Sequence, residues 1–324
     1  MKVLVLGGAG YIGSHTVYEL IDKGYDVVIV DNLSTGHIEA VHKDAKFYKG
    51  DIRDKEFLNN VLKTEKIDAV IHFAANSLVA ESMTNPLKYY DNNLCGTKVL
   101  LDAMVENNID KIVFSSTAAV YGNPKNIPIL EDDETKPLNT YGETKLSMEK
   151  MFKWVSNAYN MRYVSLRYFN ACGAHISGKI GEAHNPESHL IPTVLKSLIS
   201  DNTIKIFGDD YNTKDGTCVR DYIHVTDLAN AHILALEYLA KGNESNIFNL
   251  GNGVGFSVKE IIDASEKVAG KEVPVEVTKR RVGDPDTLIA SSAKAKELLG
   301  WKPEFTDVSK IIETAYKWHK NNRF

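Results

Sequence analysis

The stretch Val3-Leu-Val-Leu-Gly7-Gly-Ala-Gly10-Tyr-Ile-Gly13 decides the fold of this chain. An apolar run leads into three glycines with the spacing G-x-x-G-x-x-G, and residues with helical periodicity follow. Gly7 lets the chain turn off a strand, Gly10 lets the backbone approach a pyrophosphate, and Gly13 lets the helix pack closely on the strand. The stretch therefore predicts a dinucleotide site at a helix N-terminus, where free N–H groups attract phosphate.

The segments after the glycines extend this prediction. We expect Ser14 to cap the helix and Gly24 to end it. A second strand over 26–31 ends in Asp31, which lies 18 residues after Gly13. An acid at this place binds a ribose 2′-hydroxyl, so the sequence predicts NAD rather than NADP as the cofactor.

Composition and charge exclude several classes of protein. The 324 residues are enough for one large or two ordinary domains. A net charge of −5 gives no overall attraction to nucleic acid or to an anionic membrane surface. No apolar run approaches the roughly 20 residues of a membrane span. Three isolated cysteines fit a reducing compartment, so we expect a soluble cytoplasmic protein.

Predicted strands and helices alternate through the first half of the chain. We expect further strands at 47–51, 70–73, 111–115 and 162–168, and helices at 55–64, 86–107 and 141–158. Apolar strands separated by helices predict a doubly wound parallel α/β sheet of the Rossmann type. Ligands of such sheets bind beyond the carboxyl ends of the strands.

The pattern changes after Asn170. Residues 171–188 are expected to form a loop, and the later elements are shorter: strands at 204–207, 223–225 and 247–250, and helices at 190–199, 226–239, 257–268 and 308–321. We predict an NAD-binding domain over 1–172 and a smaller α/β substrate lobe over 173–324. Part of 218–250 is expected to pack back on the first domain.

The histidines do not predict a metal site. His72 lies inside a predicted strand, so we expect it in the core. His175, His184 and His189 share the loop, but their spacing and the few acids near them argue against a metal ion.

A second motif, Tyr141-Gly-Glu-Thr-Lys145, places a phenol and an ammonium on one helix face. A tyrosine ordinarily titrates near ~10, so we expect Lys145 and a positive nicotinamide to lower the pKa of Tyr141. Ser115-Ser116-Thr117 ends the preceding strand and offers a hydroxyl that holds a substrate oxygen against Tyr141. These groups predict acid–base catalysis beside a hydride carrier.

Taken together, these motifs resemble the extended short-chain dehydrogenase/reductase family. The resemblance rests on the glycine stretch, Asp31-Asn32, Asp51-Ile52, Ser115–Thr117, Tyr121-Gly122, Tyr141-x-x-x-Lys145 and Arg167–Asn170. Later segments resemble its UDP-glucose 4-epimerase branch: 32–36, 207–211, 215–217, 219–224 and 249–253. The match covers nearly the whole chain.

The resemblance implies interconversion of UDP-galactose and UDP-glucose. Tyr141 takes the proton from the sugar O4 while a hydride leaves C4 for NAD. The keto-sugar then rotates, the hydride returns to its opposite face, and NAD stays bound. The resemblance also implies a homodimer, formed by the helices near 86–107 and 141–158, and no nucleic-acid or membrane partner.

The resemblance also implies the residues of the site. The catalytic group is Tyr141, Lys145 and Thr117. The cofactor-binding set is Gly7, Gly10, Tyr11, Ile12, Gly13, Asp31, Asn32, Asp51, Ile52, Phe73, Ala74, Ala75, Asn92, Ser115, Tyr141, Lys145 and Tyr168. The substrate-binding set is Thr117, Asn170, His189, Leu190, Phe207, Arg220, Tyr222, Arg281, Asp284 and Leu288.

Two positions depart from the family pattern. The family often has a lysine just past Phe73-Ala-Ala, where this chain has Asn76-Ser77, and it often has asparagine where His189 stands. The resemblance also implies that Leu288 takes the position beside the sugar C2 substituent, where a tyrosine excludes and a small residue admits N-acetylhexosamines; leucine is intermediate. We expect UDP-galactose to be preferred, with some turnover of the N-acetyl sugar.

Three alternatives remain. Nucleotide-sugar 4,6-dehydratases share the fold but carry an acidic pair where this chain has Ala118-Ala119. Nucleotide-sugar decarboxylases usually have glutamate in that segment. A non-catalytic NAD-sensing protein would not need Tyr141, Lys145 and Thr117 together.

Overall fold

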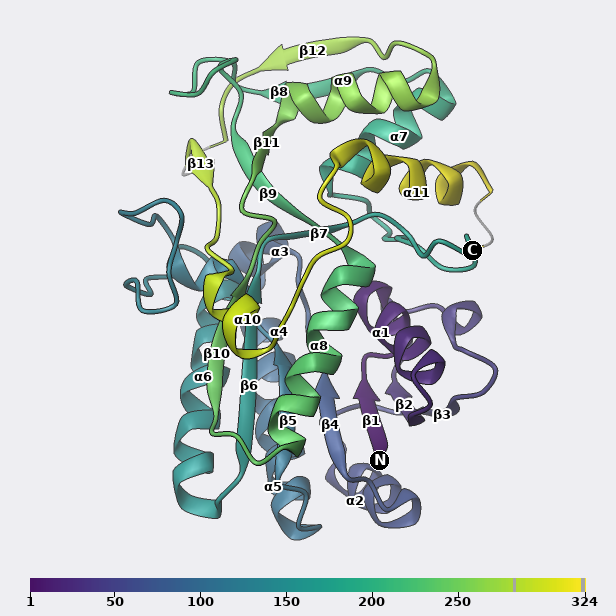
Figure 1. The fold of residues 1–324 in the computed structure, drawn as a ribbon, viewed down its shortest axis with the longest axis vertical. Helices are drawn as coiled ribbons and strands as arrows, with labels where there is room; N and C mark the ends of the chain where they lie inside the picture. Colours follow the sequence, from purple (N-terminus) through teal and green to yellow (C-terminus); the bar gives the residue numbers. More distant parts are fainter. Residues whose placement is uncertain (282–283, 322–323) are drawn as a thin grey trace.

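A seven-stranded parallel sheet forms the centre of the larger lobe (Figure 1). The structure, a computed structural model, describes residues 1–281, 284–321 and 324. The strand order is β10-β6-β5-β4-β1-β2-β3, and every neighbouring pair is parallel. The strands are β1 (Lys2–Leu6), β2 (Asp26–Asp31), β3 (Lys46–Lys49), β4 (Ala69–His72), β5 (Lys111–Ser115), β6 (Arg162–Tyr168) and β10 (Asn246–Leu250).

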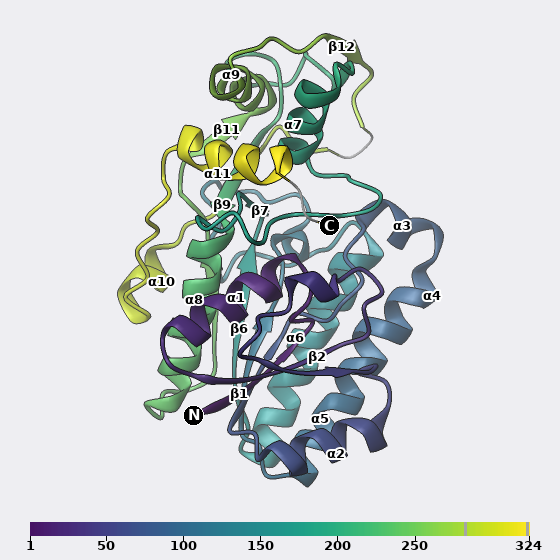
Figure 2. The ribbon, with the colours of Figure 1, turned by 90° about the vertical axis from the view of Figure 1, so that its right-hand side faces the viewer.

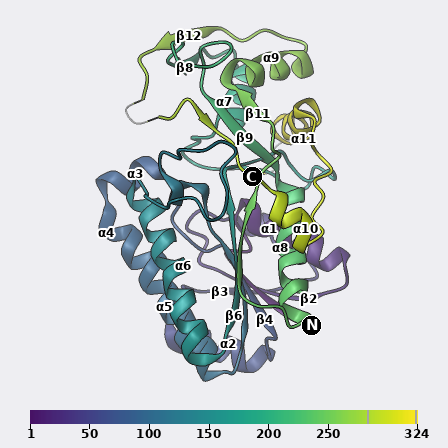
Figure 3. The same cartoon turned by 60° about the vertical axis from the view of Figure 1, so that its left-hand side comes forward.

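Helices cover both faces of this sheet (Figure 3). One face packs on α1 (Tyr11–Asp22) and α8 (Val225–Ala240). The other packs on α2 (Lys55–Glu65), α5 (Gly96–Glu106) and α6 (Thr140–Tyr159). Because both faces are buried, the strands are almost continuously apolar, as the sequence predicted.

The smaller lobe lies beyond the carboxyl ends of the parallel strands (Figures 1 and 2). Its core lies among α7 (Leu190–Ser200), α9 (Val258–Ala269) and α11 (Val308–Lys320). A pair, β8 (Ile204–Phe207) and β12 (Val275–Thr278), lies at the outer edge. A second sheet centres on β9 (Val219–His224), which pairs with β7 (Asn170–Cys172), β11 (Gly255–Ser257) and β13 (Thr287–Leu288).

The chain crosses between the lobes more than once. After β9, helix α8 packs against α1, and β10 then joins the large sheet beside β6. On the basis of this path, we propose that the NAD-binding domain ends at residue 172 and that part of 218–250 also belongs to the larger lobe.

The start of α1 differs from the prediction. The helix begins at Tyr11 with Gly10 as its N-cap, and Ser14 lies inside the first turn, where its hydroxyl donates to the Tyr11 carbonyl at 3.0 Å. The capping role expected of Ser14 is therefore wrong. Glycine at the cap leaves the helix N–H groups uncovered by any side chain. Gly24, with φ of +81°, follows the last turn as predicted.

The helix predicted over 86–107 is not regular. It consists of α4 (Pro86–Tyr89), a π-helical segment (Tyr90–Cys95) and α5, and a further helix, α3 (Val79–Thr84), precedes it. The wide π turn turns Asn93 inward, where its amide bonds the backbone of Asn76 at 2.8 and 3.1 Å. Periodicity did not reveal this because the helical rise continues through the π segment.

Three other parts of the secondary structure differ from the prediction. Residues 171 and 172, expected in a loop, belong to β7 (Asn170–Cys172), because β9 offers this segment a parallel edge. Val225, expected to end a strand, begins α8. The short helix α10 (Ala293–Leu298) was not predicted. No helix among the described residues is long and apolar enough to cross a membrane.

A buried histidine should make stability depend on pH. His72 is 1% exposed, one ring nitrogen faces the Thr97 hydroxyl at 3.0 Å, and burial lowers its pKa to about 3. The unfolded chain takes up this proton near pH 6.5, so the contribution is lost as pH falls from 6.5 toward 3, by about 1.4 kcal/mol per unit. Between pH 6.5 and 5.0 we expect wild type to lose about 2 kcal/mol more unfolding free energy than His72→Gln. Urea melts at the two pH values measure this, and equal losses would contradict it.

Candidate active site

The glycine loop joins β1 to α1 and allows no side chain at two of its positions. Gly7 has φ of +79°, and a Cβ there would lie 2.8 Å from the Ala74 nitrogen. A Cβ on Gly13 would lie 2.1 Å from the Gly7 carbonyl oxygen. The loop and the helix N-terminus therefore pack against each other through bare backbone, which is the cradle that a pyrophosphate needs.

The acid at the end of β2 is tied to this loop. Asp31 is 8% exposed and accepts the Ala9 N–H at 3.0 Å and the Leu33 N–H at 2.8 Å. Burial raises its pKa, while these two hydrogen bonds favour its charged form. Asp31 thus lies where a ribose would be bound, and its carboxylate also fixes the glycine loop.

The cofactor-binding candidates Asn32, Asp51 and Ile52 follow the strands next to Asp31. The Asn32 amide donates to Asp51 at 3.2 Å, and the Arg53 guanidinium holds the pKa of Asp51 well below its usual range. The side chain of Ile52 is buried in the core against Gly96. Any contact of Ile52 with a nucleotide must therefore come from its backbone.

The proposed catalytic residues meet at the carboxyl end of β5. Tyr141 and Lys145 lie one turn apart near the start of α6, which is capped by the Asn139 side chain. The buried Lys145 ammonium donates to the Ser115 carbonyl at 2.7 Å and lies 5.9 Å from the centre of the Tyr141 ring. The Thr117 hydroxyl lies close enough to the Tyr141 phenol to lower its pKa. The structure thus brings the three side chains together.

In the chain by itself, burial rather than Lys145 sets the pKa of Tyr141. Burial raises the pKa of Tyr141 to about 12, and the nearby Thr117 hydroxyl offsets this only in part. Burial also lowers the pKa of Lys145 to about 7, which the nearby Glu149 carboxylate partly opposes. Desolvation therefore dominates both shifts, and the lowering of the phenol pKa that the sequence predicts refers to the site with the positive nicotinamide in place.

Other members of the proposed cofactor set surround this group. The Ser115 and Tyr168 hydroxyls are hydrogen-bonded to each other. The Tyr11 phenol, on α1, donates to the Gly173 carbonyl at 2.6 Å and so links the two lobes. Asn92 donates to Asn93 at 3.0 Å. The half-buried segment Phe73–Ala75 follows β4, and Ile12 packs against the core beneath α1.

Four of the proposed substrate residues form two pairs in the smaller lobe. Arg220 donates to Asp284 at 2.8 Å. The Arg281 guanidinium lies 4.2 Å from the centre of the Phe207 ring. Two guanidinium groups and an aromatic face thus stand close together, as binding of a nucleoside diphosphate requires.

Three other substrate candidates take separate places. Asn170 donates to the Asp221 carbonyl at 3.1 Å, and Tyr222 is buried. Leu288 packs against a small apolar cluster that contains Ala118 and Tyr121, and Ala118 directly follows Thr117 in the chain.

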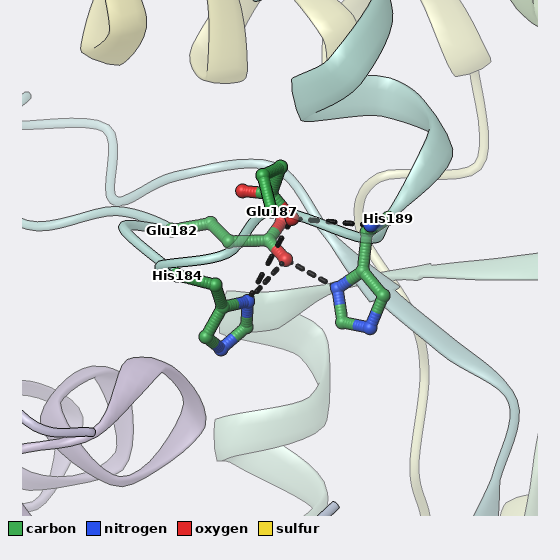
Figure 4. A group of neighbouring side chains, drawn as sticks. All are labelled: Glu182, His184, Glu187 and His189. Atoms are coloured by element: carbon green, nitrogen blue, oxygen red, sulfur yellow. Dashed lines mark hydrogen bonds and ion pairs between the residues drawn. The ribbon is translucent and has the colours of Figure 1, made fainter. Parts of the chain in front are cut away.

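His189 and the half-buried Leu190 stand at the start of α7, and the His189 ring turns toward acids (Figure 4). The His189 and His184 rings are both hydrogen-bonded to the Glu182 carboxylate, and the Glu187 carboxylate lies beside these rings. The expectation that these histidines have few acids nearby is wrong, because the loop folds back on itself.

A buried network behind the catalytic group was not predicted. Glu149 forms an ion pair with Arg167 at 2.6 Å and accepts the Ser116 hydroxyl at 2.5 Å. Arg167 also donates to the Tyr121 phenol at 2.8 Å. Glu149 lies four residues after Lys145, so helical spacing alone offered a signal for it.

Comparison with known proteins decides the family. Residues 3–251 match the model of the NAD dependent epimerase/dehydratase family. The UDP-glucose 4-epimerase of Lacticaseibacillus casei is 57% identical over 323 residues, which are 99% of this chain and 98% of that protein. The chain belongs to the NAD dependent epimerase/dehydratase family, among the UDP-glucose 4-epimerases.

Solved structures of family members agree with this fold. The UDP-glucose 4-epimerase from Brucella ovis in complex with NAD has a TM-score of 0.95 at 47% identity, covering 97% of each chain. The enzyme from Bifidobacterium longum in complex with NAD+ and UDP has a TM-score of 0.93 at 41% identity, covering 99% of each chain. The predicted family and Rossmann-type fold are confirmed. NAD is the cofactor of this epimerase family, and the cradle at Gly7 and Gly13 with Asp31 beside it fits that cofactor.

Proposed function

We propose that the chain interconverts UDP-galactose and UDP-glucose by inverting carbon 4 of the sugar. The observation that carries this proposal is the meeting of Thr117, Tyr141 and Lys145 at the strand end that faces the glycine loop. NAD, held by the glycine loop and Asp31, supplies a reversible acceptor for the C4 hydride.

The chain's own residues handle the proton. In this proposal Thr117 holds the sugar O4 against the Tyr141 phenolate, which takes the O4 proton as the C4 hydride leaves. The resulting 4-keto sugar turns over, the hydride returns to the other face of C4, and Tyr141 returns the proton to O4. Atoms and electrons balance without an external oxidant. Lys145 supplies the positive charge that favours phenolate.

A sugar that turns over must be held by the rest of the substrate. We propose that Arg220 and Arg281 bind the diphosphate, and that Phe207 lies against the uracil. In the chain without substrate, Arg220 is hydrogen-bonded to Asp284, and the Arg281 guanidinium lies against the Phe207 ring. The nucleotide would replace these two internal contacts. Binding through UDP, rather than through the hexose, leaves the sugar free to turn over.

The test is conversion of UDP-galactose to UDP-glucose by the purified protein without added nucleotide or reductant. The dehydratase alternative predicts a product lacking one water, and the NAD-sensing alternative predicts no product. A dehydratase carries its acids where this chain has Ala118 and Ala119. Ala118 is buried in the apolar cluster against which Leu288 packs.

Substrate breadth should depend on Leu288. A tyrosine at this position would fill space beside Ala118 and Tyr121, where we propose that the sugar's C2 substituent lies. We expect Leu288→Tyr to lower the activity on UDP-N-acetylgalactosamine relative to UDP-galactose by about 10-fold or more, as a steric difference of 1–3 kcal/mol does. Coupled assays with both substrates measure the ratio, and an unchanged ratio would contradict the role of Leu288.

We also propose that two copies associate through the helices of 86–107 and α6, with α3 beside them. Large apolar side chains are exposed there: Leu87 is 78% exposed, Met83 59% and Trp154 71%. Contiguous exposed apolar residues are typical of protein interfaces. Light scattering should give the mass of a dimer for wild type and of a monomer for Trp154→Glu combined with Leu87→Glu. A monomeric wild type would contradict this proposal.

A further inference from the structure

Four potential metal ligands converge in the loop between β7 and α7. Glu182, His184, Glu187 and His189 each present one ligand atom, and these atoms all lie within 4.8 Å of one another. Figure 4 shows both imidazoles turned toward the two carboxylates. His184 Nδ1 lies 3.0 Å from a Glu182 oxygen and 3.9 Å from a Glu187 oxygen, and His189 Nδ1 contacts the same Glu182 oxygen.

We propose that this loop binds one divalent transition-metal ion, and that zinc fits it best. Zinc takes four tetrahedral ligands at about 2.0–2.2 Å, which puts the ligand atoms roughly 3.4 Å apart. The donor atoms therefore need only small movements to surround an ion. Two imidazoles with two carboxylates are a donor set that suits zinc, whereas magnesium and calcium prefer oxygen alone.

The surroundings hold the carboxylates in place. Glu187 accepts the N–H groups of Ser188 and His189 on one oxygen, at 2.9 and 3.1 Å. Its other oxygen accepts Lys196 at 3.2 Å. Such outer hydrogen bonds orient the carboxylates that bind metals. The oxygen that accepts the two N–H groups is also the one that lies 3.9 Å from His184 Nδ1, so these bonds hold it beside the cluster.

Glu182 is fixed from the other side. Its side chain is 3% exposed, and its carbonyl accepts the Trp318 indole N–H of α11 at 2.9 Å. The carbonyl of the next residue, Ala183, is bonded by His37 at 2.8 Å. His184 and His189 are 28% and 49% exposed, so an ion has a path from solvent.

The charges of the cluster can accommodate an ion. Lys196 pairs with Glu187, and His184 and His189 contact Glu182. A divalent cation would take the place of the ring protons that face Glu182 and would neutralise the two carboxylates. Both rings would then be neutral, with Nδ1 on the ion and the ring hydrogen on Nε2.

The ion would join the two lobes. The His184 ring meets the Tyr11 ring of α1 edge-on, with centroids 6.0 Å apart, and His189 directly precedes α7. Zinc would thus fix the loop between β7 and α7, which contacts α1 through His184 and Tyr11. Its role is structural, separate from the proton and hydride steps.

Zinc titration of the NAD-loaded protein tests this proposal. The protein is dialysed against a chelator and then into metal-free buffer, and zinc chloride is added. We expect one zinc ion per chain by elemental analysis after gel filtration, a Kd below about 10 μM by calorimetry, and a higher Tm with zinc. His184→Ala and Glu187→Gln should each weaken zinc binding by at least about 10-fold.

His175→Ala is the matched control, because His175 lies in the same loop but contacts Glu19 and Ser177 instead. It should keep the wild-type zinc affinity. Glu187→Gln preserves the shape of the side chain, so it decides the outcome if His184→Ala does not fold. No stoichiometric zinc, or equal zinc affinity in wild type and Glu187→Gln, would overturn the proposal.

Discussion

Replacing Tyr141 with phenylalanine should lower turnover of UDP-galactose by about 10²–10⁴-fold while NAD stays bound. The variant keeps the ring and its packing but loses the oxygen that exchanges a proton with the sugar O4. The cradle at Gly7 and Gly13 and the acid Asp31 are untouched, so the content of bound NAD should equal that of wild type. Initial rates and the absorbance of released nucleotide measure the two quantities.

Tyr159→Phe is the control for this experiment. Tyr159 ends the same helix and is 61% exposed, so its loss should leave both rate and NAD content unchanged. A rate for Tyr141→Phe within a few-fold of wild type would remove Tyr141 from the proton transfer. Loss of NAD together with the rate would instead make the ring a binding group.

Replacing Gly13 with alanine should remove both NAD and activity. The new Cβ would lie 2.1 Å from the Gly7 carbonyl oxygen and 3.0 Å from the Gly8 Cα, so backbone must move. Misplacement by about 1 Å in such a site can lower the rate by about 10²-fold. We expect protein purified without NAD and activity reduced at least about 100-fold even with NAD added.

Ser14→Ala controls for a general weakening of α1. It removes one hydroxyl bond to the Tyr11 carbonyl in the same turn and leaves the cradle alone. It should keep bound NAD and most of the activity. Full NAD content in Gly13→Ala, with circular dichroism like that of wild type, would contradict the role given to the glycine loop.

The sequence predicted those parts of the site that depend on neighbours in the chain. Gly7 and Gly13 were identified because their spacing requires a tight turn, and the positive φ of Gly7 fits this reason. Tyr141 and Lys145 were identified because four residues make one helical turn. The apolar strands predicted the parallel sheet because both of its faces are buried.

Tertiary contacts set what the sequence did not predict. Glu182 and Glu187 are close to His184 and His189 in the sequence, but only the folded loop shows that the four side chains meet. The raised pKa of Tyr141 depends on burial, which spacing alone does not give. Ser14 is a good capping residue, but Gly10 takes the cap because the loop turns there.

The most direct test of the central claim follows the hydrogen on C4. UDP-galactose carrying deuterium on C4 is converted in ordinary water, and the UDP-glucose formed is analysed by mass spectrometry and NMR. If the hydride leaves C4 and returns to the other face without meeting solvent, the product keeps the deuterium on C4. Replacement of that deuterium by hydrogen from water would contradict the account.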